Sequence, residues 1–532
     1  MVAFAKISRE RARWQQGDLL GRPIEFNVMS QSADLTSARL LARNTILNLL
    51  GGAAPSLIAL VAIPILVHRL GSERYGVMTL AWLVVGYFGV FDMGLGRAAT
   101  KLIAEALGAD EPDNIAAVAW TALTMMTVLG VLGGVAMAAV SPWLVHRVLN
   151  IPPSLQSEAL HTFWLLAVAF PLIISASPLG GMLAAFQRFD LLNAVGVPFA
   201  FFSYLAPLVV LPFSHSVFWI VAVLVAGRVA SWGVQLILCV RVFPPFGRRI
   251  AVRGAMLAPL FSFGGWVTVS GITGLIMLHL DRFFISAMIS VAAVAYYSVP
   301  FQAASKLTMV PGALAGVMFP ALSAELAADP ARAARLFDRA LTYVFIALFP
   351  AALVAAVFAP EIMTLWIGSD FSAHSFWVMR WIALAAMVNG FAYFPSILLQ
   401  AAHRPDLQAK FHVAEIPAYI ASLWLGLRLF GIEGAAFVYL GRVALDAALL
   451  YWTTARILPG ARAAVMRTGL RLATGTVAIG LPFVVAAPAL RAAYVALVVA
   501  GFGAWGWRTM LAPSERENVR MHLRAALPLM SR

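Results

Sequence analysis

The sequence is poor in cysteine and in charge. Of its 532 residues only Cys239 is a cysteine, so the chain can form no internal disulfide, and 12% are Asp, Glu, Lys or Arg. A soluble protein carries about twice that charged fraction. In contrast, 61% of the chain is apolar and the mean hydropathy is +0.86. A soluble enzyme and a disordered scaffold are therefore excluded, and a lipid bilayer must surround most of the chain.

The N-terminal segment lacks the apolar core of a signal peptide. Residues 1–43 are polar and basic, so we expect no cleaved leader. Met29 is an alternative start, which would leave residues 1–28 untranslated. The net charge of +14 fits cytoplasmic loop bias and an anionic partner better than it fits nucleic acid.

Apolar runs predict fourteen transmembrane helices. The runs are continuous and span-length, unlike the ten-residue alternating segments of membrane barrels. They lie at 45–67, 77–95, 115–140, 160–179, 191–213, 217–240, 257–280, 283–300, 341–358, 376–398, 411–430, 434–452, 470–487 and 492–510.

Basic residues are unequally divided between alternate loops. With both ends inside, the inner segments carry 27 Lys and Arg and the outer segments carry 6, which predicts both termini in the cytoplasm. The expected organisation is a cytoplasmic basic segment (1–43), six helices (44–250), six helices (251–460), two further helices (461–511) and a cytoplasmic tail (512–532).

A weak internal repeat favours two equivalent lobes. The segment 70–76 resembles the segment 289–296, and six predicted spans separate the two copies. An even number of spans gives parallel repeats about an axis along the membrane normal, which is a common transporter architecture.

Five short motifs resemble one known family. They are HRLGSERYG (68–76), FDMGLGRA (91–98), DRFFI (281–285), LWIGSDF (365–371) and GIEGAA (431–436). In order and spacing they cover roughly residues 40–450. They are similar to the polysaccharide-transport family of the multidrug/oligosaccharidyl-lipid/polysaccharide exporter superfamily, the O-antigen and exopolysaccharide flippases. The last two spans hold no family motif.

The resemblance implies an all-α polytopic fold like that of the MATE exporters, with two six-helix lobes in a V around a central cavity. It implies alternating access in the bacterial inner membrane. The implied substrate is an oligosaccharide repeat unit carried on undecaprenyl pyrophosphate, for O-antigen or exopolysaccharide synthesis. The implied partners are the polysaccharide polymerase and the glycosyltransferases of the same pathway.

Charged residues inside the spans are the candidate site, because an ionisable group in a bilayer is costly and usually functional. A lipid pyrophosphate is anionic, and arginine binds phosphate and carboxylate through two parallel hydrogen bonds. The candidate substrate-binding residues are Arg228, Arg282, Lys306, Arg380 and Arg442, and the candidate ion-coupling residues are Asp92, Asp281, Glu415 and Asp446.

Several of these residues also have a structural interpretation. Arg442 and Asp446, four residues apart on one helix, can neutralise each other. Arg380 can extend to the outer membrane interface. Asp281 and Arg282 can form an exposed pair at an outer turn.

The remaining candidates have alternatives as well. Lys306 fits the ordinary cytoplasmic bias of basic residues, Asp92 can pair with Arg97, and Glu415 can have a structural role near the cytoplasmic side. Arg228 has no acidic residue one helical turn away.

No enzyme signature is present. The sequence has neither an HExxH pattern nor a GxxxxGK[ST] loop, so we expect no ATP hydrolysis, no metal and no cofactor. The short outer loops disfavour a glycan polymerase or ligase. Two alternatives stay open: a cation-coupled drug exporter, which would need acidic residues in its cavity, and a flippase for the lipid-linked peptidoglycan precursor.

Overall fold

A computed structural model describes residues 38–517, apart from 89–94, 110, 249, 259, 261–276, 278, 486, 511–512 and 514–515. The side chains at 38–57, 84–88, 95, 97, 320 and 327 also lie outside the description. Asp92, most of the predicted span 257–280 and both ends of the chain therefore fall outside the described residues.

Within the described ranges, the regular elements are helices. Their bounds are α2 (Ala38–Phe88), α3 (Leu95–Gly108), α4 (Pro112–Trp143), α5 (Pro153–Ala185), α6 (Phe189–Val210), α7 (Val217–Val242), α8 (Pro244–Arg248), α10 (Val291–Ser305), α11 (Met309–Ala328), α12 (Pro330–Val357), α13 (Ala359–Trp366), α14 (Ser369–Ala401), α15 (Pro405–Ile457), α16 (Arg462–Gly480) and α17 (Pro488–Thr509).

Eight helices among the described residues are long and apolar enough to cross a membrane. One of them, α15, contains two predicted spans and bends at Gly431, where φ is 59°. The first predicted span and residues 77–88 of the second lie in α2, which bends at Gly71 with a φ of 76°. Positive φ values are strained for residues with a Cβ, so glycine permits both reversals. The predicted total of fourteen spans stays a prediction.

The structure corrects the predicted start of the eighth span. A helix through residues 279–288 ends at Ile289, and the side chain of Ser290 then caps α10 by accepting a hydrogen bond of 3.1 Å from a first-turn N–H. A charged pair is typical of a loop, so the sequence predicts an outer turn at Asp281 and Arg282. In the structure this pair lies inside the helix and is buried.

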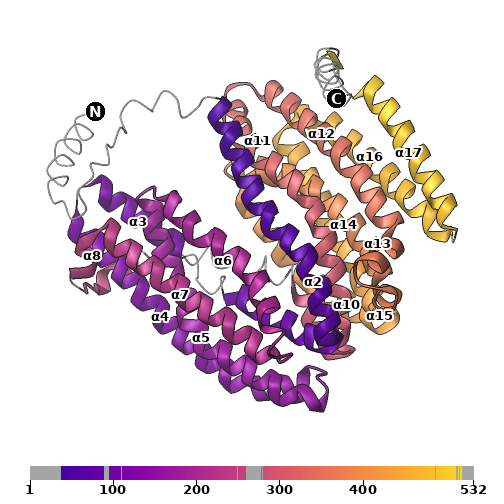
Figure 1. The fold of residues 1–532 in the computed structure, drawn as a ribbon. Coiled ribbons are helices and arrows are strands. Elements are labelled where there is room, and N and C mark those ends of the chain that lie inside the picture. The colour runs from indigo at the N-terminus through magenta and orange to yellow at the C-terminus, as the bar shows by residue number, and fades with distance from the viewer. Residues whose placement is uncertain are drawn as a thin grey trace, which may run out of the picture.

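The helices form two bundles that diverge like the arms of a V (Figure 1). Helices α3 to α8 form the first bundle, and α10 to α15 form the second, with α16 and α17 packed on its outside. Helix α2 contacts both α6 and α10. Since α2 begins and α17 ends at the open end of the V, we name this end the terminal side and the other end the opposite side.

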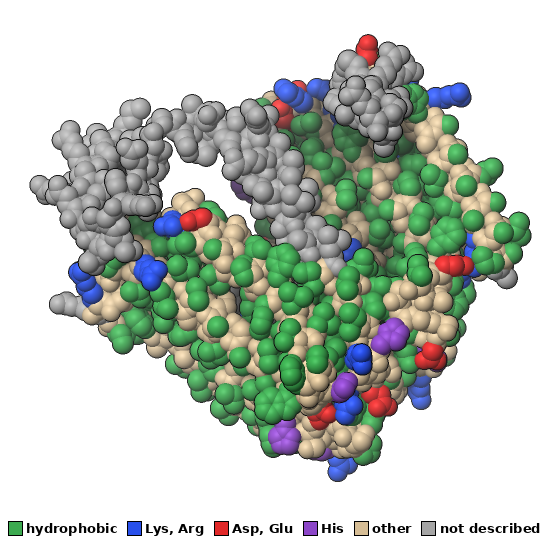
Figure 2. Space-filling model, in the orientation of Figure 1, with side chains coloured by type: hydrophobic (Ala, Val, Ile, Leu, Met, Phe, Trp, Pro, Cys, Tyr) green, Lys and Arg blue, Asp and Glu red, His purple; other side chains and the backbone are tan. Residues whose placement is uncertain are grey.

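The surface is divided in the way that a bilayer requires. Figure 2 shows hydrophobic side chains over the middle of both bundles, charged side chains gathered at the two ends, and a hollow between the bundles. Large apolar side chains such as Val135, Val168 and Leu497 are more than 60% exposed. This pattern is that of a multi-pass membrane protein.

One residue of the first bundle caps two helix ends of the second. The N–H of Asn150 donates to the carbonyl of Ser286 (3.1 Å) and its side-chain amide donates to the carbonyl of Ala287 (2.9 Å). The N–H of Val291 donates to the carbonyl of Asn150 (3.3 Å). Beside this contact Gly76 packs so closely on Val291 that a Cβ would overlap its carbonyl. Helix-end groups are thus satisfied across the junction, which closes the opposite side.

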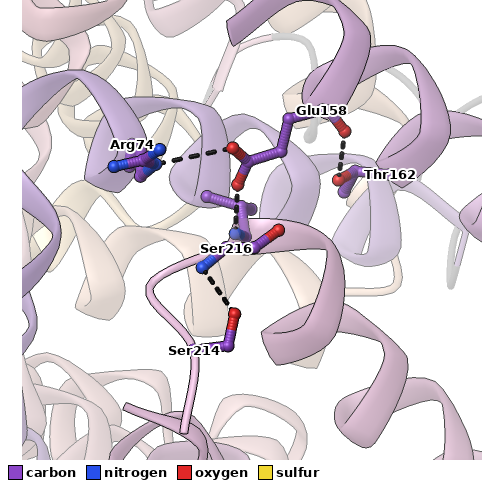
Figure 3. Close-up of polar contacts among 6 residues, drawn as sticks. Arg74, Glu158, Thr162, Ser214 and Ser216 are labelled. Carbon is purple, nitrogen blue, oxygen red and sulfur yellow. Dashed lines mark hydrogen bonds and ion pairs between the residues drawn. The ribbon is translucent and has the colours of Figure 1, made fainter. Parts of the chain in front are cut away.

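Glu158 joins three segments of the first bundle at the same side (Figure 3). Its carboxylate accepts a hydrogen bond from Nε of Arg74 (3.4 Å), just after the bend of α2, and another from the N–H of Val217 at the start of α7. The N–H of Ser216 donates to Oγ of Ser214 (3.1 Å) and shapes the turn before α7. These contacts hold this end of the bundle together as one unit.

Candidate functional site

Arg228 lines a pocket inside the first bundle. It lies near the middle of α7 and is half-buried, and its guanidinium carbon is 4.1 Å from the centroid of the Phe199 ring. Trp82 and Ser203 also line this pocket, which α2, α5, α6 and α7 enclose and which has a volume of about 80 Å³. Among the described residues, no carboxylate forms an ion pair with Arg228.

The chemistry of this pocket favours an anion. A guanidinium stays charged even when it is buried, and an unneutralised charge at this depth in a bilayer is costly. The pocket has room for several water molecules or one phosphate-sized group, so it fits a headgroup and not an oligosaccharide.

Asp281 and Arg282 form a buried ion pair in the second bundle. Their relative exposures are 0% and 3%, and Nη1 of Arg282 is 2.7 Å from Oδ1 of Asp281. The hydroxyl of Tyr297 donates to the other oxygen of Asp281 (2.6 Å), and the guanidinium of Arg282 lies 4.0 Å from the Phe301 ring centroid. The alternative of an exposed pair at an outer turn is therefore wrong. The pair connects the 279–288 helix to α10.

Two carboxylates lie close together in α15. Glu415 and Asp446, on the two halves of this bent helix, are 5% and 8% exposed. Nε2 of His412 is 3.3 Å from Oδ1 of Asp446, and no hydrogen bond reaches either carboxylate oxygen of Glu415 from the described residues. Arg442 stacks 5.1 Å from the Tyr439 ring centroid and forms no ion pair with Asp446. The predicted neutralisation of these two residues is therefore not seen.

The charge of this α15 cluster is unbalanced. With both carboxylates ionised and the histidine neutral, two negative charges face one guanidinium. A buried cluster of this kind becomes neutral when it takes up one proton or one monovalent cation. No grouping of three or more His, Cys, Asp or Glu suitable for a metal ion occurs in the part of the chain that the structure describes.

Arg380 contacts the connection between the last two helices. It is 3% exposed, and its guanidinium carbon lies 4.5 Å from the Trp377 ring centroid and 4.6 Å from that of Phe483. Phe483 belongs to the connection between α16 and α17. On α17, Arg491 pairs with Glu361 of α13. These contacts attach the terminal hairpin to the second bundle, and the guanidinium of Arg380 reaches the carbonyl of Phe483 in the connection between α16 and α17.

The predicted basic residues do not gather into one cluster. Lys306 is exposed, in the short connection between α10 and α11. Sequence reasoning missed Asn150 and Phe483, and no local signal could have found them because their partners lie more than 100 residues away along the chain. The structure brings together two groups, Asp281 with Arg282, and Glu415 with Arg442 and Asp446.

Two helical bundles around a hollow, with charged side chains buried at mid-depth, define a polytopic membrane transporter. The chain belongs to the polysaccharide biosynthesis protein family, whose signature matches residues 41–325. It is 28% identical over 426 residues to the protein of Shigella flexneri named "Putative O-antigen transporter", covering 78% of this chain and 98% of that protein.

Solved structures confirm the fold class at low sequence identity. The lipid II flippase MurJ in an inward closed conformation matches 86% of this chain and 100% of its own, with a TM-score of 0.63 at 12% identity. A MATE multidrug resistance transporter in an inward-facing conformation matches 79% of this chain and 96% of its own, with a TM-score of 0.62 at 14% identity. The match over residues 41–325 confirms the predicted family, and these structures show that the chain shares the fold of such transporters.

Proposed function

We propose that this protein is a flippase that moves undecaprenyl-pyrophosphate-linked oligosaccharide repeat units across the bacterial inner membrane by alternating access. The units would supply O-antigen or exopolysaccharide synthesis, with the polymerase and glycosyltransferases of that pathway as partners. The family and the Shigella relative support a polysaccharide substrate. The 27 to 6 division of basic residues makes the terminal side cytoplasmic, so the hollow opens toward the cytoplasm.

The observation that carries the proposal is the unneutralised Arg228 in its small pocket. A drug exporter for cations would place acidic groups there, whereas an anionic headgroup needs a basic one. In the proposed cycle the guanidinium binds a phosphate or carboxylate of the substrate, the glycan occupies the hollow, and the polyprenyl chain stays in the bilayer. Lys306, Arg282, Arg380 and Arg442 stay predicted contacts of the same substrate.

The first test replaces Arg228 in a strain that lacks the chromosomal gene. Hydrogen bonds to a charged group contribute about 1.5–3 kcal/mol, so Arg228→Ala is expected to lower export of surface polysaccharide about tenfold or more. Arg228→Lys keeps the charge and loses the two-pronged geometry, so we expect partial export. The measurement is surface polysaccharide together with lipid-linked repeat units that face the cytoplasm.

A matched control is Arg428→Ala. Arg428 also stacks on an aromatic ring, at 5.0 Å from the Trp424 centroid, but it is exposed on the outside of α15, so its replacement is expected to leave export unchanged. Normal export by Arg228→Ala at normal protein level would remove Arg228 from the site. In the deletion strain, lysis with accumulated cell-wall precursor would indicate a peptidoglycan flippase, and new sensitivity to cationic drugs would indicate an exporter.

We propose that the α15 cluster binds the coupling ion. Its two carboxylates lie at similar depth: Glu415 follows the start of α15 by ten residues and Asp446 precedes its end by eleven, so both lie roughly 15 Å from the terminal side. Asp281 already pairs with Arg282 and is the weaker candidate. Asp92 stays a prediction outside the described residues.

Removing one carboxylate should uncouple transport. Glu415→Gln and Asp446→Asn each neutralise the cluster with little change of shape, so uptake of a labelled repeat unit into inverted vesicles is expected to stop responding to an imposed proton or sodium gradient. Gln408→Ala, on the same helix and bonded to Ser396, serves as the control. A gradient response that persists in both carboxylate variants would contradict this assignment.

A further inference from the structure

Two turns on the terminal side, one in each bundle, share an unusual main-chain conformation. The first joins α5 to α6, and the second joins α14 to α15. Each contains a residue other than glycine in the left-handed region: Gln187 has a φ of 59° and His403 a φ of 55°. The described part of the chain contains no other such residue. Side chains disfavour this conformation, so the same strained turn occurs twice.

The hydrogen bonds of the two turns match as well. The N–H of Arg188 donates to the carbonyl of Leu183 (2.9 Å), and the N–H of Arg404 donates to the carbonyl of Leu399 (2.8 Å). In both turns this hydrogen bond spans six residues, as in the Schellman motif that ends a helix at a residue in the left-handed conformation. Corresponding residues are separated by 216 positions throughout. The turns are therefore equivalent positions of an internal repeat.

Each turn also carries the same ion pair. Nε of Arg188 donates to Oδ1 of Asp190 (2.9 Å), and Nε of Arg404 donates to Oδ1 of Asp406 (3.1 Å). Lys410 contacts the second oxygen of Asp406 (2.9 Å). The Arg188 hydrogen bond holds the pKa of Asp190 below its usual value, while Lys410 and then Arg404 lower the pKa of Asp406 to about 2. Both carboxylates are thus charged throughout the physiological range.

The carboxylates lie in the first turns of α6 and α15, where they favour the helix start, but their ion pairs with arginine add little to the stability of the fold. The side chains of Arg188 and Arg404 are 37% and 53% exposed, and those of Asp190 and Asp406 are 62% and 43% exposed. Exposed ion pairs contribute little to folding because water and salt screen them. The exposed carboxylate oxygens can therefore accept from a second guanidinium, and the exposed guanidinium N–H groups can donate to a second carboxylate.

We propose that the two turns, which we name the RxD turns, meet when the hollow closes on the terminal side, and that their ion pairs then exchange partners across the two bundles. Arg188 would bind Asp406, and Arg404 would bind Asp190. Parallel repeats around a central axis place equivalent turns symmetrically about the hollow, so one contact generates the other. This inference deepens the proposed function, because it assumes the alternating access proposed above.

Reversing the charges of a turn tests the exchange without breaking its local pair. Arg188→Asp with Asp190→Arg keeps an ion pair within the first turn but sets like charges against the second turn. We expect export to fall at least tenfold. Reversing the second turn as well, with Arg404→Asp, Asp406→Arg and Lys410→Glu, restores opposite charges across the hollow. We expect export to return to within about twofold of the unmodified protein.

Two results would overturn the proposal. If the pairs only stabilise their own turns, reversal of the first turn alone exports normally. If the charges at these positions act in some other way, the reversal of both turns fails to recover export although the protein reaches the membrane at a normal level. Protein level and the melting temperature of the purified protein are measured for every variant, so a misfolded variant is recognised.

A cross-link gives a readout that does not depend on the glycan. Gln187→Cys and His403→Cys are combined with Cys239→Ser, which removes the native thiol. A short bis-methanethiosulfonate reagent, which joins two thiols through disulfides, should link the two cysteines in membrane vesicles and halt transport until a reductant cleaves the disulfides. A cross-link in a strain with no glycan phenotype would support the RxD turns and refute the proposed substrate. Active transport with no cross-link would refute the RxD turns alone.

Discussion

Arg380 shows how a single side chain can secure a distant element. It was predicted as a substrate contact, and the structure surrounds it with aromatic rings from α14 and from the α16–α17 connection. A desolvated cation–π contact contributes about 2 kcal/mol or more. Arg380→Ala is therefore expected to lower the melting temperature of the purified protein by several degrees and to make the α16–α17 hairpin sensitive to protease. Export should fall as a consequence.

The geometry also predicts that lysine is a poor substitute. A planar guanidinium stacks between rings and an ammonium does not, so Arg380→Lys should regain less than half of the lost thermal stability. Arg456→Ala provides the comparison, because Arg456 stacks 3.8 Å from the Trp452 centroid on an exposed surface. Should Arg380→Ala lose export while its melting temperature is unchanged, Arg380 would return to the substrate contacts.

At the scale of elements, the hydrogen bonds of Asn150 join the two bundles at the opposite side, so in the proposed cycle they would oppose opening there. Asn150→Ala removes one side-chain hydrogen bond, worth about 1 kcal/mol, and keeps the two main-chain bonds. The population open at the opposite side should rise about fivefold. In a protein with Cys239→Ser and Val291→Cys, an impermeant thiol reagent added outside should label residue 291 correspondingly faster.

The control for this measurement lies near Asn150, at the start of α5. Gln156 bonds to His146 (2.8 Å) and to the carbonyl of Ile151 (3.1 Å) within the first bundle, so Gln156→Ala should leave the labelling rate unchanged. Equal acceleration by both variants would mean that loop mobility, and not the cap on the second bundle, sets the rate.

At the scale of the whole molecule, hydrophobic length predicts most of the architecture. The predicted runs at 115–140, 217–240 and 376–398 all fall within single helices, α4, α7 and α14, because a span must bury its own backbone polar groups. The start of the eighth span was wrong because Asp281 and Arg282 look like loop residues until each is seen to neutralise the other. A hydropathy score counts each charged residue separately and does not register that two opposite charges form an ion pair.

The site was less predictable than the fold for the same reason. Sequence showed that Glu415 and Asp446 are costly in a bilayer, but only the bend of α15 brings them together. The RxD turns and their flanks left five identities at a spacing of 216 residues, between 183–191 and 399–407, a match short enough to be overlooked without the matching φ values of Gln187 and His403. The short motif is recognised as a repeat because its two copies adopt the same main-chain conformation.

The cap made by Asn150 has a consequence for the energetics of the cycle. The opposite side is closed by short, largely main-chain hydrogen bonds, whereas the terminal side would close through exposed charges that salt screens within about 8 Å at physiological ionic strength. Closing the terminal side would therefore depend on ionic strength, whereas closing the opposite side would not. In the proposed cycle the loaded carrier closes its terminal side before it discharges its cargo, so the ionic strength of the cytoplasm would act on the delivery stroke, whereas the state that is closed on the opposite side would depend little on salt.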